Sequence, residues 1–337
     1  MPINSNPTVR QHQVQQKYLE AWCNANHQLW IYRKEDRKQF LTNTANAFLR
    51  KAYYKLKPIN DQERIILLSW VGEPAASSFV SKKPIRTIPD IINSMAGILK
   101  EWEKVKNQKK DLFQHSIDLL IFYSSSLGVI KSIKSPVEAE LIDNLKSISD
   151  ISMQSIESYY CGIEEAGMPI ITKILNNETI DSDDMQDLTS YVCVQYFRTS
   201  DIGSIIENSS TPQFDMSNIR PILQILLGMK ISDSMNTKQS DIQLIENNSS
   251  VPFFTGSQPV INILAVPGQR PEELQFYFPI SPELALLVTP DGSKQYSKKQ
   301  ISDASAIDAL NLKIISNSEV IATKERDDIN RYSLLRI

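Results

Sequence analysis

Hydrophobic residues recur at helical spacing through residues 59–207, and this long stretch separates two regions whose pattern is typical of strands. An apolar stripe over residues 91–102 is one clear example. The last helix of the stretch is predicted over residues 181–206. Its first residues include Asp181 and Asp184, whose carboxylates favour a helix N-terminus by capping it and by complementing its dipole.

The first sixty residues predict a helix followed by a hairpin. Val14, Tyr18, Leu19 and Trp22 recur near helical spacing, which predicts a helix over residues 8–24. Two short segments rich in aromatic and aliphatic residues then flank a charged hexapeptide, and this pattern predicts a β-hairpin with a polar turn. The two segments cover residues 29–32 and 39–41, and the turn covers residues 33–38.

The pattern changes again after residue 231. Residues 232–250 are polar and are predicted to form a loop. A helix over residues 302–315 and a short strand or helix over residues 319–322 end the chain. We therefore expect an α+β fold, in which a helical body carries an N-terminal β-hairpin and a C-terminal, mostly antiparallel sheet. The strands of that sheet are predicted over residues 253–255, 260–264, 274–278 and 284–288.

Composition excludes several classes of protein. The chain has 337 residues, of which 41% are hydrophobic and 22% charged, as in a globular protein. It has neither of the glycine-rich loops that hold nucleotides in Rossmann and P-loop folds. The odd, widely spaced cysteines favour reduced thiols, and no cysteine-histidine spacing indicates a zinc site. The chain has no signal-like start and no long apolar run, so we expect a cytoplasmic protein without membrane contact. We also expect neither a bound metal nor a cofactor.

Charge is distributed unevenly along the chain. Residues 1–60 carry ten Lys or Arg and three Asp or Glu, a net charge of +7, whereas the whole chain has a net charge of −3. A basic segment on an acidic body suits a partner rich in phosphate, such as a nucleic acid or a nucleotide. A solvated surface without a specific partner explains the same distribution, and the acids inside the charged hexapeptide favour a simple turn.

Six short motifs follow one another along the chain in a defined order. The first is H-x-V-x-Q-x-Y-L, with His12, Gln16 and Tyr18, followed by L-W-I-Y and a Tyr-Tyr pair. A later helix carries Gln-x-x-Arg-Thr, and two proline-containing turns complete the set. The later motifs consist of Gln195, Arg198 and Thr199; of residues 255–260, T-G-S-Q-P-V; and of residues 279–282, P-I-S-P.

In these motifs the chain resembles the prokaryotic family called domain of unknown function 4238. The chain departs from the family pattern in three places. Gln15 stands where a proline is usual, Ser257 replaces an aspartate and Gln258 replaces an asparagine. The resemblance implies four parts: residues 1–56 with the helix and hairpin, a helical insertion over 57–155, a helical core over 156–231, and a segment over 251–337 that completes the domain. It also implies an association with antiphage defence or mobile genetic elements.

The polar residues of these motifs admit a catalytic and a structural interpretation. In the catalytic one, His12 is a general acid or base, Arg198 holds an anion and pairs with Glu164, and other side chains bind the substrate. This set suits phosphodiester chemistry without a metal. In the structural interpretation, the same residues form a buried polar network that fixes the hairpin to the helical body. The proposed binding residues are Gln16, Tyr18, Gln195 and Thr199.

Two functions follow from these interpretations. The first is an enzyme of antiphage defence, a nuclease or nucleotide-processing enzyme that acts through His12, Arg198 and Glu164. The second is a sensor or scaffold without catalytic activity. Its partner would be a phage component or another defence protein, such as one encoded in the same operon.

Overall fold

The computed structural model describes residues 10–51, 53–54, 156–157, 160–211, 216–266, 271, 273–290 and 292–333. The predicted insertion at residues 57–155, with its apolar stripes, lies outside the described residues. The chain divides into two compact units. The first unit comprises residues 1–11, 51–162 and 205–226, and the second comprises residues 12–50, 163–204 and 227–337.

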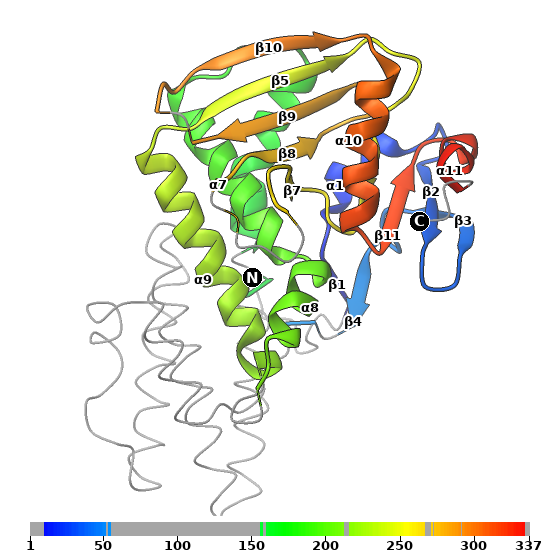
Figure 1. Ribbon diagram of the computed structural model, residues 1–337, viewed down its shortest axis with the longest axis horizontal. Coiled ribbons are helices and arrows are strands. Elements are labelled where there is room, and N and C mark those ends of the chain that lie inside the picture. The colour runs from blue at the N-terminus through cyan, green and yellow to red at the C-terminus, as the bar shows by residue number, and fades with distance from the viewer. Residues whose placement is uncertain are drawn as a thin grey trace, which may run out of the picture. The chain divides into compact units, whose positions relative to one another are not determined.

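A four-stranded sheet in the second unit contains the predicted hairpin. Its strands are β2 (Gln28–Arg33), β3 (Lys38–Asn43), β11 (Val320–Thr323) and β6 (Thr255–Gly256), in the order β3-β2-β11-β6. The hairpin is confirmed, with Arg33 opposite Lys38 beside the charged turn. The element predicted over residues 319–322 as a strand or a helix is the strand β11, which pairs antiparallel with β2. The first and last parts of this unit therefore share one sheet (Figure 1).

The C-terminal sheet of the second unit has five strands in the order β10-β5-β9-β8-β7. Only β10 and β5 run parallel, and the other neighbours are antiparallel. The protein is thus α+β, with the predicted hairpin and a mostly antiparallel C-terminal sheet. The strands are β5 (Asp241–Asn247), β7 (Ile261–Asn262), β8 (Phe276–Pro279), β9 (Leu284–Thr289) and β10 (Tyr296–Ile301).

The prediction of a loop over residues 232–250 is wrong. Helix α9 (Met216–Thr237) continues to Thr237, and β5 lies between β9 and β10. Ile242 and Leu244 are buried, while Gln243 between them is partly exposed. A strand with one apolar face has a low average hydrophobicity, and this hid β5 in the sequence. Strand β10 was also missed because its average hydrophobicity is low, and most of its side chains are exposed.

The predicted helix over residues 181–206 is interrupted. Helix α7 (Ser182–Arg198) is followed by Thr199, whose backbone is extended, and α8 (Ser200–Asn208) begins immediately after it. The predicted cap is confirmed: the Asp181 side chain accepts hydrogen bonds from the backbone N–H groups of Asp183 and Asp184. Residues 160–175 form the helix that precedes α7.

The prediction of one helix over residues 8–24 is also wrong. This segment forms β1 (Arg10–His12), then a single turn α1 (Gln16–Leu19) and a 3-10 turn η1 (Glu20–Trp22). Strand β1 pairs with β4 (Leu49–Lys51). The apolar spacing misled the prediction because a single turn of helix followed by a 3-10 turn also directs Tyr18, Leu19 and Trp22 inward.

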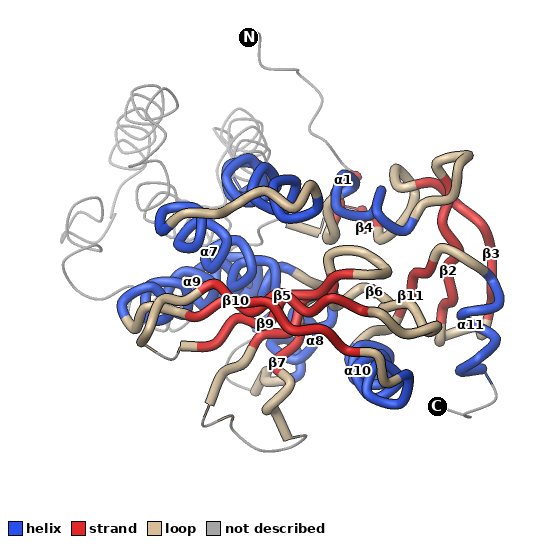
Figure 2. The backbone as a smooth tube through the Cα atoms, turned by 90° about the horizontal axis from the view of Figure 1, so that it is seen from above, coloured by secondary structure: helices blue, strands red, loops and turns tan. Residues whose placement is uncertain are grey.

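Two apolar cores lie on opposite faces of the five-stranded sheet. On one face, Phe276 and Phe278 of β8 belong to the core that contains Leu188 and Val192 of α7. On the other, Tyr277 packs in the core that contains Ile307 and Ile314 of α10 (Ala304–Asn317). Figure 2 shows α7 and α10 on the two sides of the sheet. Strand alternation thus fixes which helix each residue of β8 meets. Helix α10 confirms the helix predicted over residues 302–315.

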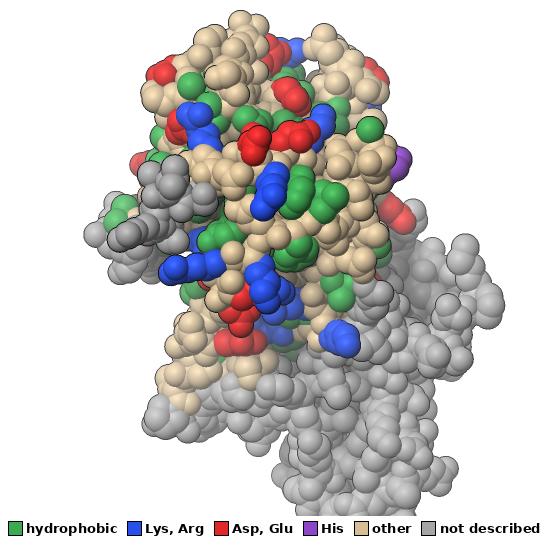
Figure 3. Space-filling model, turned by 90° about the vertical axis from the view of Figure 1, so that its right-hand side faces the viewer, with side chains coloured by type: hydrophobic (Ala, Val, Ile, Leu, Met, Phe, Trp, Pro, Cys, Tyr) green, Lys and Arg blue, Asp and Glu red, His purple; other side chains and the backbone are tan. Residues whose placement is uncertain are grey.

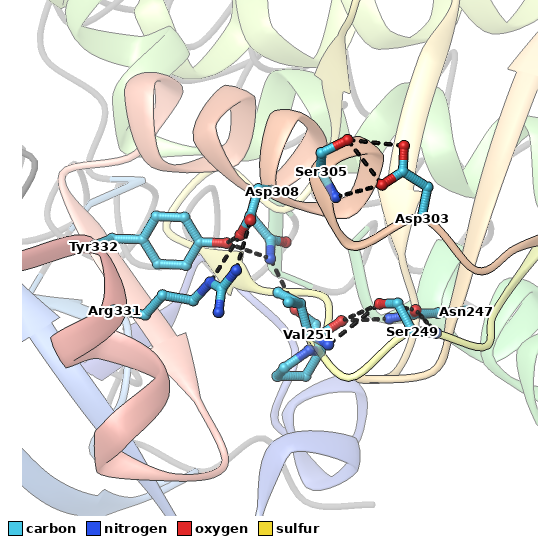
Figure 4. A network of polar contacts seen from close by, with 10 residues as sticks. Asn247, Ser249, Val251, Asp303, Ser305, Asp308, Arg331 and Tyr332 are labelled. Carbon is cyan, nitrogen blue, oxygen red and sulfur yellow. Dashed lines mark hydrogen bonds and ion pairs between the residues drawn. The ribbon is translucent and has the colours of Figure 1, made fainter.

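The C-terminal helix α11 (Arg326–Ser333) is held against α10 by polar contacts. Arg331 donates two hydrogen bonds to Asp308 of α10, and the Tyr332 hydroxyl donates a third (Figure 4). These contacts lower the pKa of Asp308, chiefly through the bond from Arg331. Asn311, fully buried in α10, accepts a bond from the Phe254 N–H and donates one to the Pro252 carbonyl.

None of the helices in the described residues combines the length and the apolar character that crossing a membrane requires.

We predict that Gly167→Ala destabilises the protein. A Cβ atom at Gly167 would lie 2.4 Å from Cγ of Tyr191 in α7, too close for any side chain. The overpacking should lower the free energy of unfolding by about 1–3 kcal/mol, measured by urea denaturation. Gly162→Ala in the same helix is the control, because nothing lies within 4 Å of its Cβ position. The control should gain about 0.5–1 kcal/mol from helix propensity. Equal stability of Gly167→Ala and the wild type would contradict the packing.

Candidate functional site

The guanidinium of Arg198, at the end of α7, is buried in the second unit. Its side chain is 3% exposed and forms an ion pair with Glu164, whose side chain is 14% exposed. Nη2 of Arg198 also donates a hydrogen bond to the backbone carbonyl of His12 at 2.8 Å. The predicted pairing of Arg198 with Glu164 is therefore observed, and the charge of the arginine is balanced inside the protein.

Gln195 makes a similar contact one turn earlier in α7. Its side-chain amide donates to the backbone carbonyl of Gln13 at 3.0 Å, and the residue is buried. Gln195 and Arg198 thus bind two successive backbone carbonyls, those of Gln13 and His12, where β1 ends. Since buried carbonyls need donors, the Gln-x-x-Arg spacing places two donors on consecutive turns for this purpose.

The imidazole of His12 lies at the edge of this network. Its Nε2 donates to the carbonyl of Ala45 at 3.1 Å, and its Nδ1 accepts from the side-chain amide of Gln16 at 3.4 Å. His12 is half-buried and Gln16 is exposed. Because His12 belongs to β1 and Gln16 begins α1, the two residues meet across a turn and not on the single helix predicted over residues 8–24. His12 reaches Arg198 through its backbone carbonyl, whereas its ring contacts other groups.

Tyr18 connects α1 with two of the proline-containing motifs. Its hydroxyl donates to the Pro279 carbonyl and contacts Oγ1 of Thr255, both at 2.7 Å. The ring stacks on Phe278, with centroids 5.0 Å apart. Burial is the largest effect on the hydroxyl and raises the pKa of Tyr18 well above its usual value. The phenol is therefore a neutral anchor in the core.

Thr199 and Gln258 join the end of α7 to the proline-containing motif at residues 255–260. The Thr199 hydroxyl donates to the side-chain oxygen of Gln258. The amide nitrogen of Gln258 donates to the carbonyls of Tyr196 at 2.9 Å and Val260 at 2.7 Å. Both residues are buried. Gln258 was noted in the sequence only as a departure from the family pattern, and the amide in a proline-containing motif was the signal for its role.

Ser257, the other departure, also has a structural partner. Its hydroxyl accepts hydrogen bonds from the backbone N–H groups of Glu319 and Val320, at 3.0 and 3.2 Å, where β11 begins. A serine here satisfies two donors without a charge. Among the residues that the structure describes, no group of three or more His, Cys, Asp or Glu side chains is placed to hold a metal ion.

Gln13 and Gln15 were missed by the sequence analysis as members of the site. Gln13 contributes its carbonyl to Gln195, and the Gln15 side chain accepts a hydrogen bond from the Tyr191 hydroxyl at 3.3 Å. A backbone contact leaves no trace in side-chain type. The run of amides between His12 and Lys17 was the available signal for Gln15.

The Tyr-Tyr motif belongs to a separate polar cluster in the first unit. The guanidinium of Arg220 lies 3.8 Å from the ring centroid of Tyr53 and donates to the Tyr53 carbonyl at 2.6 Å. Glu207 forms an ion pair with the same guanidinium. The ring of Tyr54 packs on Tyr160, with centroids 5.1 Å apart. Here too an arginine is held among backbone and side-chain partners.

One comparison with known protein families found a match that covers most of the chain. The model of the family described as "Protein of unknown function (DUF4238)" matches residues 10–333. The chain belongs to the DUF4238 family. Neither the curated proteins nor the solved structures include a match to it.

In this DUF4238 protein the polar side chains of the motifs hold the main chain in place. Arg198, Gln195 and Tyr18 each donate a hydrogen bond to a main-chain carbonyl. Both ring nitrogens of His12 also take part in hydrogen bonds. For Arg198 to hold an external anion, it would have to give up Glu164 and leave a half-buried carboxylate without its partner. The geometry therefore favours the structural interpretation of the network over the catalytic one.

We predict that Arg198→Met lowers the free energy of unfolding by about 3–5 kcal/mol, because Glu164 loses its cation in a largely buried place. The double variant Arg198→Met with Glu164→Gln should be more stable than the single one, since no unpaired charge remains. Chemical denaturation of each purified variant measures both effects. Arg33→Met is the control, because its ion pair with Asp36 is exposed and should contribute little. A single variant as stable as the control would show that the pair is not needed.

We also predict that stability falls at alkaline pH. The pKa of Tyr18 is raised in the folded protein, mainly by burial, so the folded state holds the phenol proton more tightly than the unfolded chain. This contribution is complete below the unfolded pKa of about 10 and is lost as the pH rises above it. Tyr18→Phe should lose stability at pH 8 but depend less on pH between about 9 and 11. Unfolding by urea across that range tests the difference, and equal slopes for both proteins would contradict it.

Proposed function

We propose that this protein is a recognition module of bacterial antiphage defence, a sensor or scaffold that acts in the cytoplasm and binds a protein partner. The observation that carries the proposal is the occupation of Arg198. Its guanidinium is buried, paired with Glu164 and bonded to the His12 carbonyl, so the strongest candidate for anion binding is already used in holding the fold. The setting in defence rests on the resemblance of the motifs to the DUF4238 family.

The network gives such a module a rigid frame. It joins the segment around His12, helix α7 and the turn at Gln258 through hydrogen bonds that are buried and directional. Buried networks of this kind favour one arrangement of a core, because each alternative leaves a polar group without a partner. Recognition surfaces benefit from a frame of this kind because less conformational entropy is lost on binding.

A phosphodiester enzyme without a bound metal is the second candidate. One observation favours it: the His12 imidazole is only half-buried, and Gln16 and Ala45 fix its orientation. In this mechanism the ring would have to release one of these hydrogen bonds before it could act as an acid or base on a nucleic acid or nucleotide.

Substitution of His12 distinguishes the two candidates. A bacterial host that expresses the wild type, His12→Ala or Arg198→Met is challenged with a panel of phages, and the efficiency of plating is measured. We expect His12→Ala to protect as well as the wild type, because its side chain serves no reaction. Arg198→Met should lose protection together with folded protein.

The same experiment has two outcomes that would overturn the proposal. If the wild type gives no protection, the assignment to defence is wrong. If His12→Ala loses protection while its melting temperature is unchanged, and the purified wild type degrades RNA, DNA or nucleotides with or without Mg²⁺ or Mn²⁺, the enzyme is the correct candidate.

A further inference from the structure

Strand β3 is an edge strand. It lies at the end of the order β3-β2-β11-β6, and no other strand of the described residues pairs with its outer side (Figure 1). All six of its residues pair in regular register with β2. An edge strand of this length presents a row of backbone N–H and C=O groups that can pair with another extended chain.

The side chains of β3 do little to block such pairing. Phe40 and Leu41 are 37% and 38% exposed, and as neighbours in a strand they project to opposite faces of the sheet. Proteins usually protect an exposed edge with lysines, prolines or bulges. β3 has one lysine, Lys38 at its first position, and no proline. Each face of this edge therefore offers an apolar contact to a neighbouring strand.

A guanidinium accompanies the apolar contact on each face. Arg33 lies over the ring of Phe40, 5.6 Å from its centroid, on one face. On the other face, Arg326 of α11 lies 5.4 Å from the ring centroid of Trp30 and donates to the Gln39 side chain. Trp30 pairs with Leu41 and so shares its face. Figure 3 shows Lys and Arg side chains beside hydrophobic ones on the side that carries these strands and α11.

Positive charge is in excess along the hairpin. Residues 28–43 contain four Lys or Arg and two Asp or Glu, a net charge of +2, in a chain whose net charge is −3. Asp36 is the shared partner of both Arg33 and Lys38, at 2.9 and 3.2 Å. A single carboxylate between two exposed cations leaves the pair attractive to a further acidic group. A second copy of this chain would bring the same excess of cations to the edge and is therefore disfavoured.

We propose that the outer edge of β3 binds an extended segment of a partner protein that contains both acidic and apolar residues, as an added strand. The proposal rests on the recognition function above and names the partner's chemistry. Main-chain hydrogen bonds hold the segment in line with β3. Its apolar side chains contact Phe40 and Leu41, and its carboxylates lie near Arg33 and Arg326.

Peptide binding tests this proposal on the full chain. The probe is a fluorescent peptide of about ten residues, long enough for one strand, that mixes Glu, Val and Thr so that both faces carry acid and apolar groups. We expect binding by fluorescence anisotropy. Replacing Glu by Lys in the peptide should weaken it at least about tenfold, and N-methylation of alternate backbone nitrogens should do the same by removing donors.

Protein variants locate the site. Phe40→Lys and Leu41→Lys should each weaken binding about tenfold, whereas Val266→Lys and Leu264→Lys should leave it unchanged, although these side chains are 52% and 43% exposed. A fluorescent single-stranded RNA and a single-stranded DNA of about ten nucleotides are tested in parallel.

Several results would overturn the proposal: no binding of the acidic peptide, equal binding of the lysine peptide, or binding that survives both β3 substitutions. RNA or DNA binding that these substitutions abolish would instead make the hairpin a nucleic-acid surface. A dimer that sedimentation detects in the wild type but not in Leu41→Lys would make β3 a contact between copies. Peptide binding to β3 does not involve His12. If the peptide fails to bind while His12→Ala still protects against phage, only the β3 site is rejected and the proposed function stands.

Discussion

The fold of the second unit depends on a buried arginine that neutralises Glu164 and at the same time binds the main chain at His12. An unpaired guanidinium in this place would be prohibitively costly, and a pair without further hydrogen bonds would barely offset its own desolvation. The bond from Arg198 to the His12 carbonyl changes this balance, because it adds a hydrogen bond to the ion pair. The ion pair and the N-terminal segment thus stabilise each other.

The motifs, which are distant from one another in sequence, build the contacts around this arginine. His12, Gln195 and Thr255 are far apart in sequence, yet each contributes to a contact between the first turn, α7 and the strand turn. These contacts exchange amide, hydroxyl and carbonyl groups, and they are directional. An apolar core alone tolerates many arrangements of similar volume, whereas a network of buried hydrogen bonds tolerates few. Specificity of arrangement is the role that the geometry supports for these residues.

The sequence predicted those parts of the fold whose signal is local. The hairpin at residues 29–41, the Asp181 cap and the helix at residues 302–315 each depend on neighbours along the chain, and all are observed. The pairing of Arg198 with Glu164 was also predicted, because a guanidinium can fork onto a carboxylate and the resemblance places a glutamate on the preceding helix. The predictions of a helix at residues 8–24 and of a loop at residues 232–250 were wrong, because both segments contain strands that pair with segments distant in sequence. The use of main-chain carbonyls as acceptors could not be predicted, since a carbonyl is present at every residue.

The departures from the family pattern show what the network requires. Ser257 stands where the pattern has an aspartate, and its hydroxyl still accepts two backbone donors at the start of β11. Gln258 stands for an asparagine, and its longer side chain spans α7 and the turn through Tyr196 and Val260. A reaction that used the carboxylate would not survive the change to serine, whereas a hydrogen-bonding role does. The residues at these two positions therefore keep hydrogen-bond acceptors and donors without a charge, as a structural network requires.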